Sequence, residues 1–374
     1  MRILVFSWRD PKHPLAGGAE QVMHEHMKGW IRAGHQVTLF SSRLKEQSVE
    51  EIVDGINIVR HGNQYCSVQF AGFCYYLKNK DKYDFVVDQF HGLPFLTPLY
   101  VKKPKVAVIQ ETAREVWFLN PLPFPINIII GVLGYIGEPL FFYLYKNISF
   151  ITGSESAKND VIKFGIPKKN INVVHHGIIT SKISPSIKKE KKFTVVFLGI
   201  LSKDKGIEDA LKCFSILKNK GNYQFWIVGR PETEEYNQKI KRIVKNLNLV
   251  KDIKFWGFVS NEKKFELLKR AHILINPSVK EGWGLVNIEA NSIGTPVVAY
   301  NSKGLIDSVK HNKSGILCKS NTPDELAVNI LKLLNHKNKY KKLMKESFLW
   351  SQNFSWEKSI ALSLQLINKI KVNY

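Results

Sequence analysis

The chain is poor in cysteine and begins without a long apolar run. Only 4 of its 374 residues are cysteines: Cys66, Cys74, Cys213 and Cys318. No two of them form a CxxC pair or a zinc spacing, which excludes a disulfide scaffold and a cysteine-bound zinc site and indicates a reduced, cytosolic protein. The apolar run at residues 3–6 is too short for a signal peptide, so we expect a first β-strand there.

Acidic residues are few compared with basic ones. Lysine and arginine number 55 against 32 aspartates and glutamates, which gives a formal net charge of +23. Nucleic acid and an anionic membrane are the partners that such a charge favours, and a lysine-rich solvated surface is the simpler alternative. The lysines are spread along the chain, and no RRM or zinc-finger signature occurs. We therefore expect no nucleic acid and a peripheral, cytoplasmic position on the inner face of a membrane.

Charged residues are absent from residues 116–137, VWFLNPLPFPINIIIGVLGYIG. The segment is long enough to span a bilayer, but Pro121, Pro123 and Pro125 argue against one continuous helix. The uninterrupted apolar part, residues 126–136, is too short to span. We predict helices over residues 116–145 that form partly domain core and partly a membrane contact, with plain core as the alternative.

Short apolar strands alternate with helical stretches along the chain, and its length suffices for two domains. This alternation predicts an α/β protein with two doubly wound parallel sheets. In the first half we predict strands at 3–7, 36–41, 85–88, 106–110 and 149–154, and helices at 20–33 and 156–164. In the second half we predict strands at 194–199, 223–229, 253–256, 273–277 and 296–299, and helices at 206–218, 233–247, 261–271 and 285–292. A polar, basic stretch at 178–192 predicts an interdomain linker, and residues 356–370 predict a last helix.

The stretch most informative about chemistry is residues 280–300, KEGWGLVNIEANSIGTPVVAY. Glu281 and Glu289 stand on either side of the turn Gly282-Trp283-Gly284, and Leu285 begins the predicted helix. Backbone N–H groups at a helix start bind anions, and nearby carboxylates suit hydroxyl groups, so a nucleotide sugar is a fitting ligand. Eight helical residues rise about 12 Å, against the roughly 5 Å between the carboxylates of a retaining hydrolase. The two glutamates are therefore predicted to contact different parts of one extended ligand.

Other candidate ligand contacts follow predicted strands. The loop at 199–206 carries Lys203 and Lys205 beside a helix start, where positive charge suits a diphosphate. Two further strand ends and the paired glycines before the first helix complete the candidate contacts to such a ligand: Gly229, Arg230, Phe258, Val259, Gly17 and Gly18. The paired glycines allow close backbone approach, but the loop is not GxGxxG, so the dinucleotide fingerprint is absent.

Further candidate ligand contacts lie in the first half, at His91, Gln110 and Arg114. Arg114 suits a phosphate, and His91 follows the strand predicted at 85–88. Gln110 ends the strand predicted at 106–110; its amide donates hydrogen bonds but does not shuttle protons.

The spacing Glu281-(seven residues)-Glu289 resembles the E-x7-E motif of retaining glycosyltransferases of the GT-B fold, family 4, and the resemblance runs from Met1 to about Trp356. It implies two Rossmann-like domains facing a cleft: residues 1–180 bind the acceptor, residues 193–354 bind the nucleotide sugar, and a helix over 355–374 crosses back. It further implies retaining transfer of a hexose from a GDP- or UDP-linked donor to an acceptor hydroxyl, without cofactor or metal. The charge and the apolar segment favour a glycan acceptor that is lipid-linked or at a membrane surface.

The resemblance also implies residue roles. Glu281 lies by the transferred sugar and Glu289 holds ribose hydroxyls, while amides near Gly284 and Leu285 meet the β-phosphate. Lys205 stands where the family has its lysine, so Glu281 and Lys205 are the expected catalytic residues. The loop with Gly17 and Gly18 would lie between donor diphosphate and acceptor, and the loop with Phe258 would frame the nucleobase. The other donor contacts would be Lys203, Gly229, Arg230 and Val259, and the acceptor contacts would be His91, Gln110 and Arg114.

The chain departs from the family pattern at two positions. Ile200 replaces the arginine of the Gly-Arg-Leu pattern, and Gln110 stands where many relatives place a histidine. Lys203 is a point charge and does not reproduce a bidentate arginine. A sugar-nucleotide 2-epimerase, a catalytically impaired binding protein and a basic nucleic-acid binder remain the alternatives.

Overall fold

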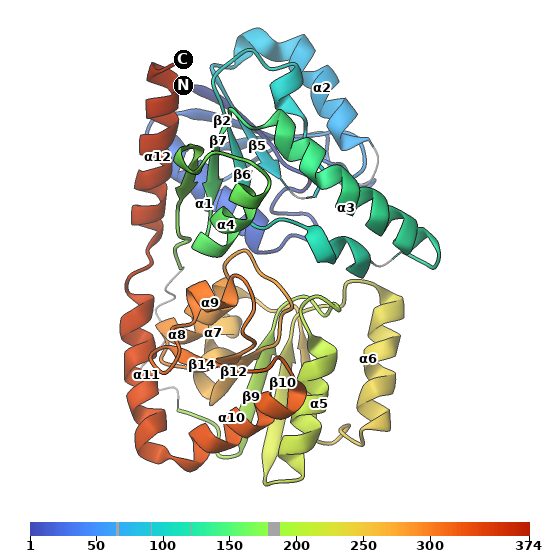
Figure 1. The fold of residues 1–374 in the computed structure, drawn as a ribbon, viewed down its shortest axis with the longest axis vertical. Coiled ribbons are helices and arrows are strands. Elements are labelled where there is room, and N and C mark those ends of the chain that lie inside the picture. The colour runs from blue at the N-terminus through green and yellow to red at the C-terminus, as the bar shows by residue number, and fades with distance from the viewer. Residues whose placement is uncertain (65–66, 91, 121, 179–187) are drawn as a thin grey trace. The chain divides into compact units, whose positions relative to one another are not determined.

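The computed structural model describes residues 1–64, 67–90, 92–120, 122–178 and 188–374. The chain forms two compact units (Figure 1). Unit 1 comprises Met1–Gly177 and Trp356–Tyr374, and unit 2 comprises Ile178–Ser355. Each unit has one sheet with helices packed on it, so the predicted α/β class is confirmed.

The sheet of unit 1 has eight strands in the order β3-β4-β2-β1-β5-β6-β7-β8. Their bounds are β1 Arg2–Phe6, β2 Gln36–Ser41, β3 Glu50–Val53, β4 Ile56–Arg60, β5 Phe85–Phe90, β6 Lys105–Ile109, β7 Ser149–Thr152 and β8 Ile171–Val173. Among these strands only β3 and β4 pair antiparallel. Asp54 and Gly55 join them with positive φ at both residues, 51° and 82°, which is the geometry of a two-residue hairpin turn. The prediction of a wholly parallel sheet therefore fails at this edge, because Asp54-Gly55 was not recognised as a hairpin turn.

The helices of unit 1 are α1 Gly18–Arg32, α2 Val68–Asn79, α3 Ile126–Leu144, α4 Glu155–Lys163 and α12 Trp356–Val372, with short 3-10 turns at η1 Lys80–Lys82, η2 Thr97–Leu99, η3 Arg114–Leu119 and η4 Lys168–Asn170.

The last helix, α12, packs against α1. The Trp30 indole N–H donates to Ser363 Oγ at 3.0 Å, and a Cβ on Gly29 would lie 2.3 Å from a side-chain carbon of Ile360. Because α1 offers only a glycine there, the two helices approach closely and α12 belongs to unit 1.

The apolar segment forms two helical pieces separated at the prolines, η3 and α3, as predicted. Pro123 and Pro125 precede α3, with Pro125 at its N-cap, where the missing N–H costs no intrahelical bond. Pro139 lies inside the helix without ending it, and Pro121 lies outside the described residues. The prediction of more than one helix over this segment is therefore confirmed, although α3 continues past the apolar run at 126–136 to Leu144.

The sheet of unit 2 has six strands, all parallel, in the order β11-β10-β9-β12-β13-β14. Their bounds are β9 Phe193–Leu198, β10 Tyr223–Val228, β11 Ile253–Gly257, β12 Ile273–Asn276, β13 Val297–Ala299 and β14 Gly315–Leu317. Its helices are α5 Ile207–Lys218, α6 Glu234–Asn246, α7 Asn261–Arg270, α8 Leu285–Ser292, α9 Leu305–Ser308, α10 Pro323–Asn335 and α11 Lys337–Ser351. All the elements predicted for this half are present, and the core between the sheet and helices is aliphatic and aromatic.

Part of the predicted linker belongs to the body of unit 2. Lys189 Nζ donates to Thr295 Oγ1 at 2.8 Å, and burial lowers the pKa of Lys189 to about 7. Arg270 forms an ion pair with Glu190 at 2.7 Å. The linker prediction is therefore wrong for Lys189, Glu190 and Lys192, whose charges find partners in the domain. Residues 179–187 lie outside the described residues.

Acid is expected to weaken unit 1 through a histidine between α1 and α12. His26 is buried, its Nε2 lies 2.9 Å from Ser359 Oγ, and burial lowers its pKa to about 4 from an ordinary 6.5. The unfolded chain therefore takes up this proton near pH 6.5, whereas the folded chain resists it until about pH 4. The resulting stability is complete above pH 6.5 and is lost progressively as the pH falls, by about 2 kcal/mol between pH 7 and pH 5.

The measurement is urea unfolding of the wild type and of His26→Gln at both pH values. We expect the variant to be less stable at pH 7 but to lose less stability on acidification. His176 is present in both proteins; burial is the main cause that lowers its pKa to about 3, and the charge of His26 is a smaller one. Equal losses in the two proteins would show that His26 is not the titrating group.

Candidate functional site

The candidate site of unit 2 lies at the carboxyl end of its sheet. The strand order reverses between β9 and β12, and in open α/β sheets ligands bind at such a switch point. The loop after β9 carries Lys203 and Lys205, and the loop after β12 carries Glu281 to Gly284. The sheet therefore brings together two loops that are about 80 residues apart in sequence.

The structure joins the two expected catalytic residues directly. Lys205 Nζ lies 3.2 Å from Glu281 Oε1 and 3.4 Å from Asp204 Oδ2. Ser278 Oγ donates to Glu281 Oε1 at 2.9 Å, which orients the carboxylate. Burial raises the pKa of Asp204, but the charge of Lys205 and the hydroxyl of Ser202 outweigh it and hold that pKa below its ordinary value. One lysine thus lies between two carboxylates, and Asp204 and Ser278 were not predicted.

A glycine allows the two loops to touch. Gly206 has a φ of +72°, and a Cβ there would lie 2.1 Å from the carbonyl oxygen of Pro277. The loops are also hydrogen-bonded, since the Val279 N–H donates to the Asp204 carbonyl at 2.8 Å. The position of Lys205 relative to Glu281 therefore depends on backbone contacts as well as on the ion pair.

The start of α8 has the form of an anion site. Gly284 is its N-cap residue, with a left-handed φ of +79°, and makes no side-chain cap. The first-turn N–H groups, including that of Leu285, are therefore not capped by a side chain, and the helix dipole adds positive potential. Glu281 precedes this turn, and a carboxylate, a lysine and a helix start thus gather in one place.

Glu289 and Trp283 have different surroundings from those we expected. Glu289 is in the second turn of α8, as predicted, but it is only 4% exposed and Lys264 of α7 pairs with its Oε1 at 2.6 Å. Trp283 is 3% exposed and packs edge-on against Phe354 in a cluster with Ile288. Its side chain is therefore not the ligand contact that we predicted, and only its main chain is left for that role. An indole is mainly apolar, and the core of unit 2 buries it.

The loops after β10 and β11 form a small stacked platform. The guanidinium of Arg230 lies over the ring of Phe258 at 4.8 Å, and Phe258 is 74% exposed. Gly229 links this platform to the loop after β9, because a Cβ there would lie 1.8 Å from the Gly199 carbonyl oxygen. Val259 follows the platform half-buried, while Lys203 is exposed. An exposed aromatic ring beside a cation suits a planar, anionic ligand such as a nucleotide.

In unit 1, Gly17 is the N-cap residue of α1 and Gly18 its first residue. The Gly17 N–H donates to Glu20 Oε2 at 2.7 Å, so this amide is already paired. Arg114 starts η3 with a φ of +41°, and its guanidinium lies over the rings of Tyr135 and Phe164, at 5.0 and 4.6 Å. His91 lies outside the described residues.

A histidine that we did not predict lies next to Gln110. A Cβ on Gly153 would lie 2.5 Å from His176 Nε2 and 3.2 Å from Gln110 Oε1, so the two side chains meet over this glycine. His176 is 4% exposed, and burial makes it a neutral imidazole by lowering its pKa to about 3. The sequence signal was the His175-His176 pair after β8, a strand of three residues that was too short to recognise.

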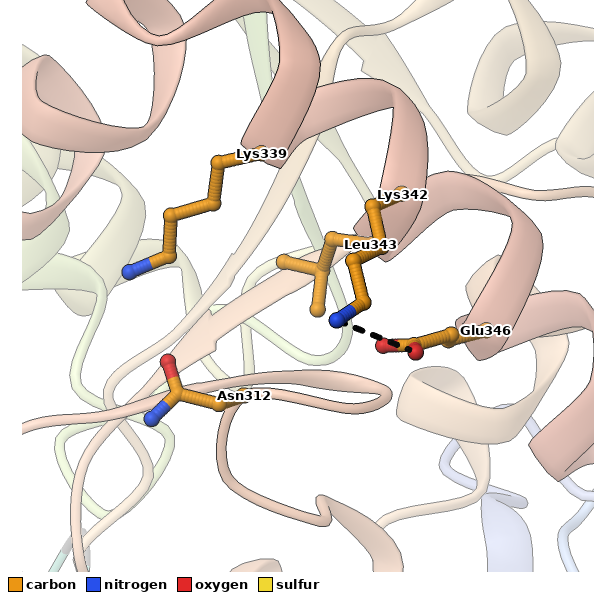
Figure 2. Close-up of a pocket in the computed structure, with 5 residues that line it drawn as sticks. All are labelled: Asn312, Lys339, Lys342, Leu343 and Glu346. Atoms are coloured by element: carbon orange, nitrogen blue, oxygen red, sulfur yellow. Dashed lines mark ion pairs between the residues drawn. The ribbon is translucent and has the colours of Figure 1, made fainter.

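A pocket outside these loops holds none of the predicted residues. It has a volume of about 360 Å³ and lies between α11 and the loop at Asn312. Figure 2 shows Lys339, Lys342 and Glu346 pointing toward it, with Lys342 and Glu346 forming an ion pair at 3.8 Å. The lysine side chains are flexible, and Lys342 and Glu346 already pair with each other, so the pocket does not offer a fixed set of hydrogen-bond donors to a ligand.

Known proteins match both units. Residues 179–350 match the family described as Glycosyl transferases group 1, and residues 16–182 match Glycosyltransferase Family 4. Two uncharacterised glycosyltransferases of Methanocaldococcus jannaschii are similar: one is 30% identical over 70% of this chain and 67% of its own length, the other 24% identical over 90% and 89%. The glycosyltransferase CapM of capsular polysaccharide biosynthesis in Staphylococcus aureus is 26% identical over 62% and 66%.

Solved structures share the fold over the whole chain. Sucrose-phosphate synthase from Thermosynechococcus elongatus superposes with a TM-score of 0.81 at 18% identity and covers 100% of both chains. HepE from Anabaena, solved in complex with UDP-glucose, has a TM-score of 0.73 at 19% identity and covers 98% of this chain and 99% of its own. With two Rossmann-like units and these matches, the chain belongs to the group 1 glycosyltransferases of the GT-B fold.

Proposed function

We propose that this glycosyltransferase moves a hexose from a GDP- or UDP-linked donor to an acceptor hydroxyl, with retention at the anomeric carbon. The observation that carries the proposal is the Lys205–Glu281 pair beside the uncapped start of α8. A cation and the backbone N–H groups at a helix start suit a diphosphate, and a carboxylate at the same place suits sugar hydroxyls. That HepE was solved with UDP-glucose supports this donor class.

The residues have distinct roles in this proposal. Lys205 and the first-turn amides of α8 stabilise the negative charge that develops on the leaving diphosphate, so that no metal is required. Glu281, oriented by Ser278, binds hydroxyls of the transferred sugar. Arg230 and Phe258 hold the base or its phosphates, and Glu289 turns from Lys264 to the ribose hydroxyls. Gly17 and Gly18 approach the donor diphosphate.

Transfer needs no enzyme nucleophile in this scheme. The acceptor oxygen forms a bond to the anomeric carbon on the face from which the diphosphate departs. The bond between that carbon and the diphosphate oxygen breaks, and the departing phosphate takes the acceptor proton. Gln110 and Arg114 orient the acceptor, a role that needs hydrogen bonds and not a proton shuttle. The acceptor is a lipid-linked or membrane-surface glycan, supported by the net charge of +23 and the apolar helix α3.

A ligand panel tests the donor class. We expect GDP or UDP, or one of their sugars, to raise the melting temperature of the protein, whereas nucleosides without phosphate do not. A ligand at a hundred times its dissociation constant stabilises the folded state by about 2.7 kcal/mol. Lys212→Ala, which removes a surface lysine of α5 that pairs with Asp209, serves as the control and should retain the shift that Lys205→Ala loses. No shift with any nucleoside diphosphate would contradict the proposal, and an epimerised donor formed without acceptor would favour the 2-epimerase.

A further inference from the structure

Helix α3 is apolar on both of its faces. Its inward face packs on η3: a Cβ on Gly131 would lie 2.6 Å from the ring of Phe118, and one on Gly134 would lie 2.3 Å from the indole of Trp117. The inward positions Glu138 and Phe142 are also buried. Figure 1 shows α3 as a long helix on the outside of unit 1.

The opposite face of α3 carries a continuous stripe of exposed apolar side chains. They recur at alternating steps of four and three residues and are between 54% and 71% exposed: Ile129, Leu133, Ile136, Leu140 and Tyr143. Three more exposed apolar side chains lie at the start of the stripe: Ile126, the first residue of the helix, and Leu122 and Phe124 before it, of which Phe124 is 83% exposed. We call these eight residues the α3 surface. The solvent face of a helix in a globular protein is normally polar, so a contiguous apolar face of this kind marks an interaction site.

The helix is held on the domain by a buried carboxylate. Glu138 is 3% exposed and accepts hydrogen bonds from the backbone N–H groups of Ala113 and Arg114, at 2.7 and 2.8 Å. Among the described helices α3 alone is long and apolar enough to cross a bilayer. Crossing would place Glu138 in hydrocarbon and leave both amides without their acceptor, which is costly. The inward contacts therefore favour a helix that lies along a surface and does not span it.

The charge of the chain indicates what covers the α3 surface. Glu138, which is buried, is the only acidic residue from position 116 to position 154, and the whole chain has a formal net charge of +23. A second copy of this chain also carries a net charge of +23, and the repulsion between two such chains disfavours self-association. An anionic bilayer offers both hydrocarbon for the stripe and negative headgroups for the lysines.

We propose that the α3 surface binds an anionic membrane, with α3 lying in the plane of the interface and its stripe inserted among the acyl chains. The acceptor-binding unit of the proposed function then works at the bilayer surface. Vesicle binding requires neither donor nor acceptor, so its failure is a separate result from a failure of transfer.

Flotation with vesicles tests this inference. The probes are phosphatidylcholine vesicles with and without phosphatidylglycerol, at low and high salt. We expect the wild type to float with the anionic vesicles and to be partly released by salt. Leu133→Gln with Ile136→Gln keeps good helix formers and the net charge, and should lower the partition coefficient at least about tenfold. The matched control is Ile52→Gln with Leu362→Gln, which removes two exposed apolar residues of unit 1 from β3 and α12 and should bind as the wild type does.

Three outcomes would overturn the inference. In the first, the wild type does not bind anionic vesicles; in the second, the α3 double variant binds them as tightly as the wild type does. In the third, light scattering shows a wild-type dimer that the α3 variant loses while no vesicles bind, which assigns the surface to a second copy. Circular dichroism and thermal unfolding verify that both double variants are folded.

Discussion

Lys205→Ala is expected to lower the turnover of hexose transfer by about 10²–10³-fold, the range observed when one preorganised group that stabilises transition-state charge is removed. Lys205 is positioned by two carboxylates, at 3.2 Å from Glu281 and 3.4 Å from Asp204, so its charge is fixed before the diphosphate departs. The substitution also leaves Glu281 and Asp204 facing each other without a cation, which adds repulsion against an anionic donor. The measurement is kcat and KM with the donor identified by the ligand panel.

The control for this experiment is Lys212→Ala. Lys212 is on the neighbouring helix α5 and pairs with Asp209 at 3.3 Å on the surface, so its loss changes the net charge equally without touching the site. We expect its kcat and KM to stay within about twofold of the wild type. A Lys205→Ala enzyme that also keeps its turnover would remove Lys205 from the mechanism and favour a binding protein that has lost activity.

Gly206→Ala is expected to destabilise unit 2 by about 2–5 kcal/mol. A left-handed conformation costs a residue with a Cβ about 1–2 kcal/mol, and overpacking adds about 1–3 kcal/mol more. The added Cβ would lie 2.1 Å from the Pro277 carbonyl oxygen, a backbone atom that cannot rotate away. Relief requires the loops after β9 and β12 to separate, so we also expect weaker binding of nucleoside diphosphate.

Gly294→Ala separates the two causes. Gly294 has nearly the same φ, +74° against +72°, but the nearest atom to its Cβ is 3.6 Å away. Its substitution should therefore cost only the conformational part, about 1–2 kcal/mol, and leave ligand binding unchanged. Urea unfolding of both variants, followed by ligand titration, gives the comparison. If the two substitutions cost the same, the contact between the loops contributes nothing to stability.

Strands and helices with clear periodicity were predictable from the sequence, because burial on one or both faces requires a repeating apolar pattern. Features that depend on few residues were missed. The β3–β4 hairpin depends on one Asp-Gly pair, and β8 has only three residues. The linker was predicted to be too long because Lys189 and Glu190 have the residue types of solvated charges, although both have partners in the body of unit 2.

The sequence by itself determined the family, the two α/β units and the loops that carry the candidate site. It did so because the E-x7-E spacing, the glycines and the strand ends are local properties of the chain. Only the tertiary structure decided that Lys205 meets Glu281, that Glu289 pairs with Lys264, and that Trp283 is packed as core. It also showed that His176 lies beside Gln110 and that the apolar side chains on the outer face of α3 are exposed. These are contacts between distant parts of the chain, or the lack of them, and residue type alone does not specify which side chains the fold brings together.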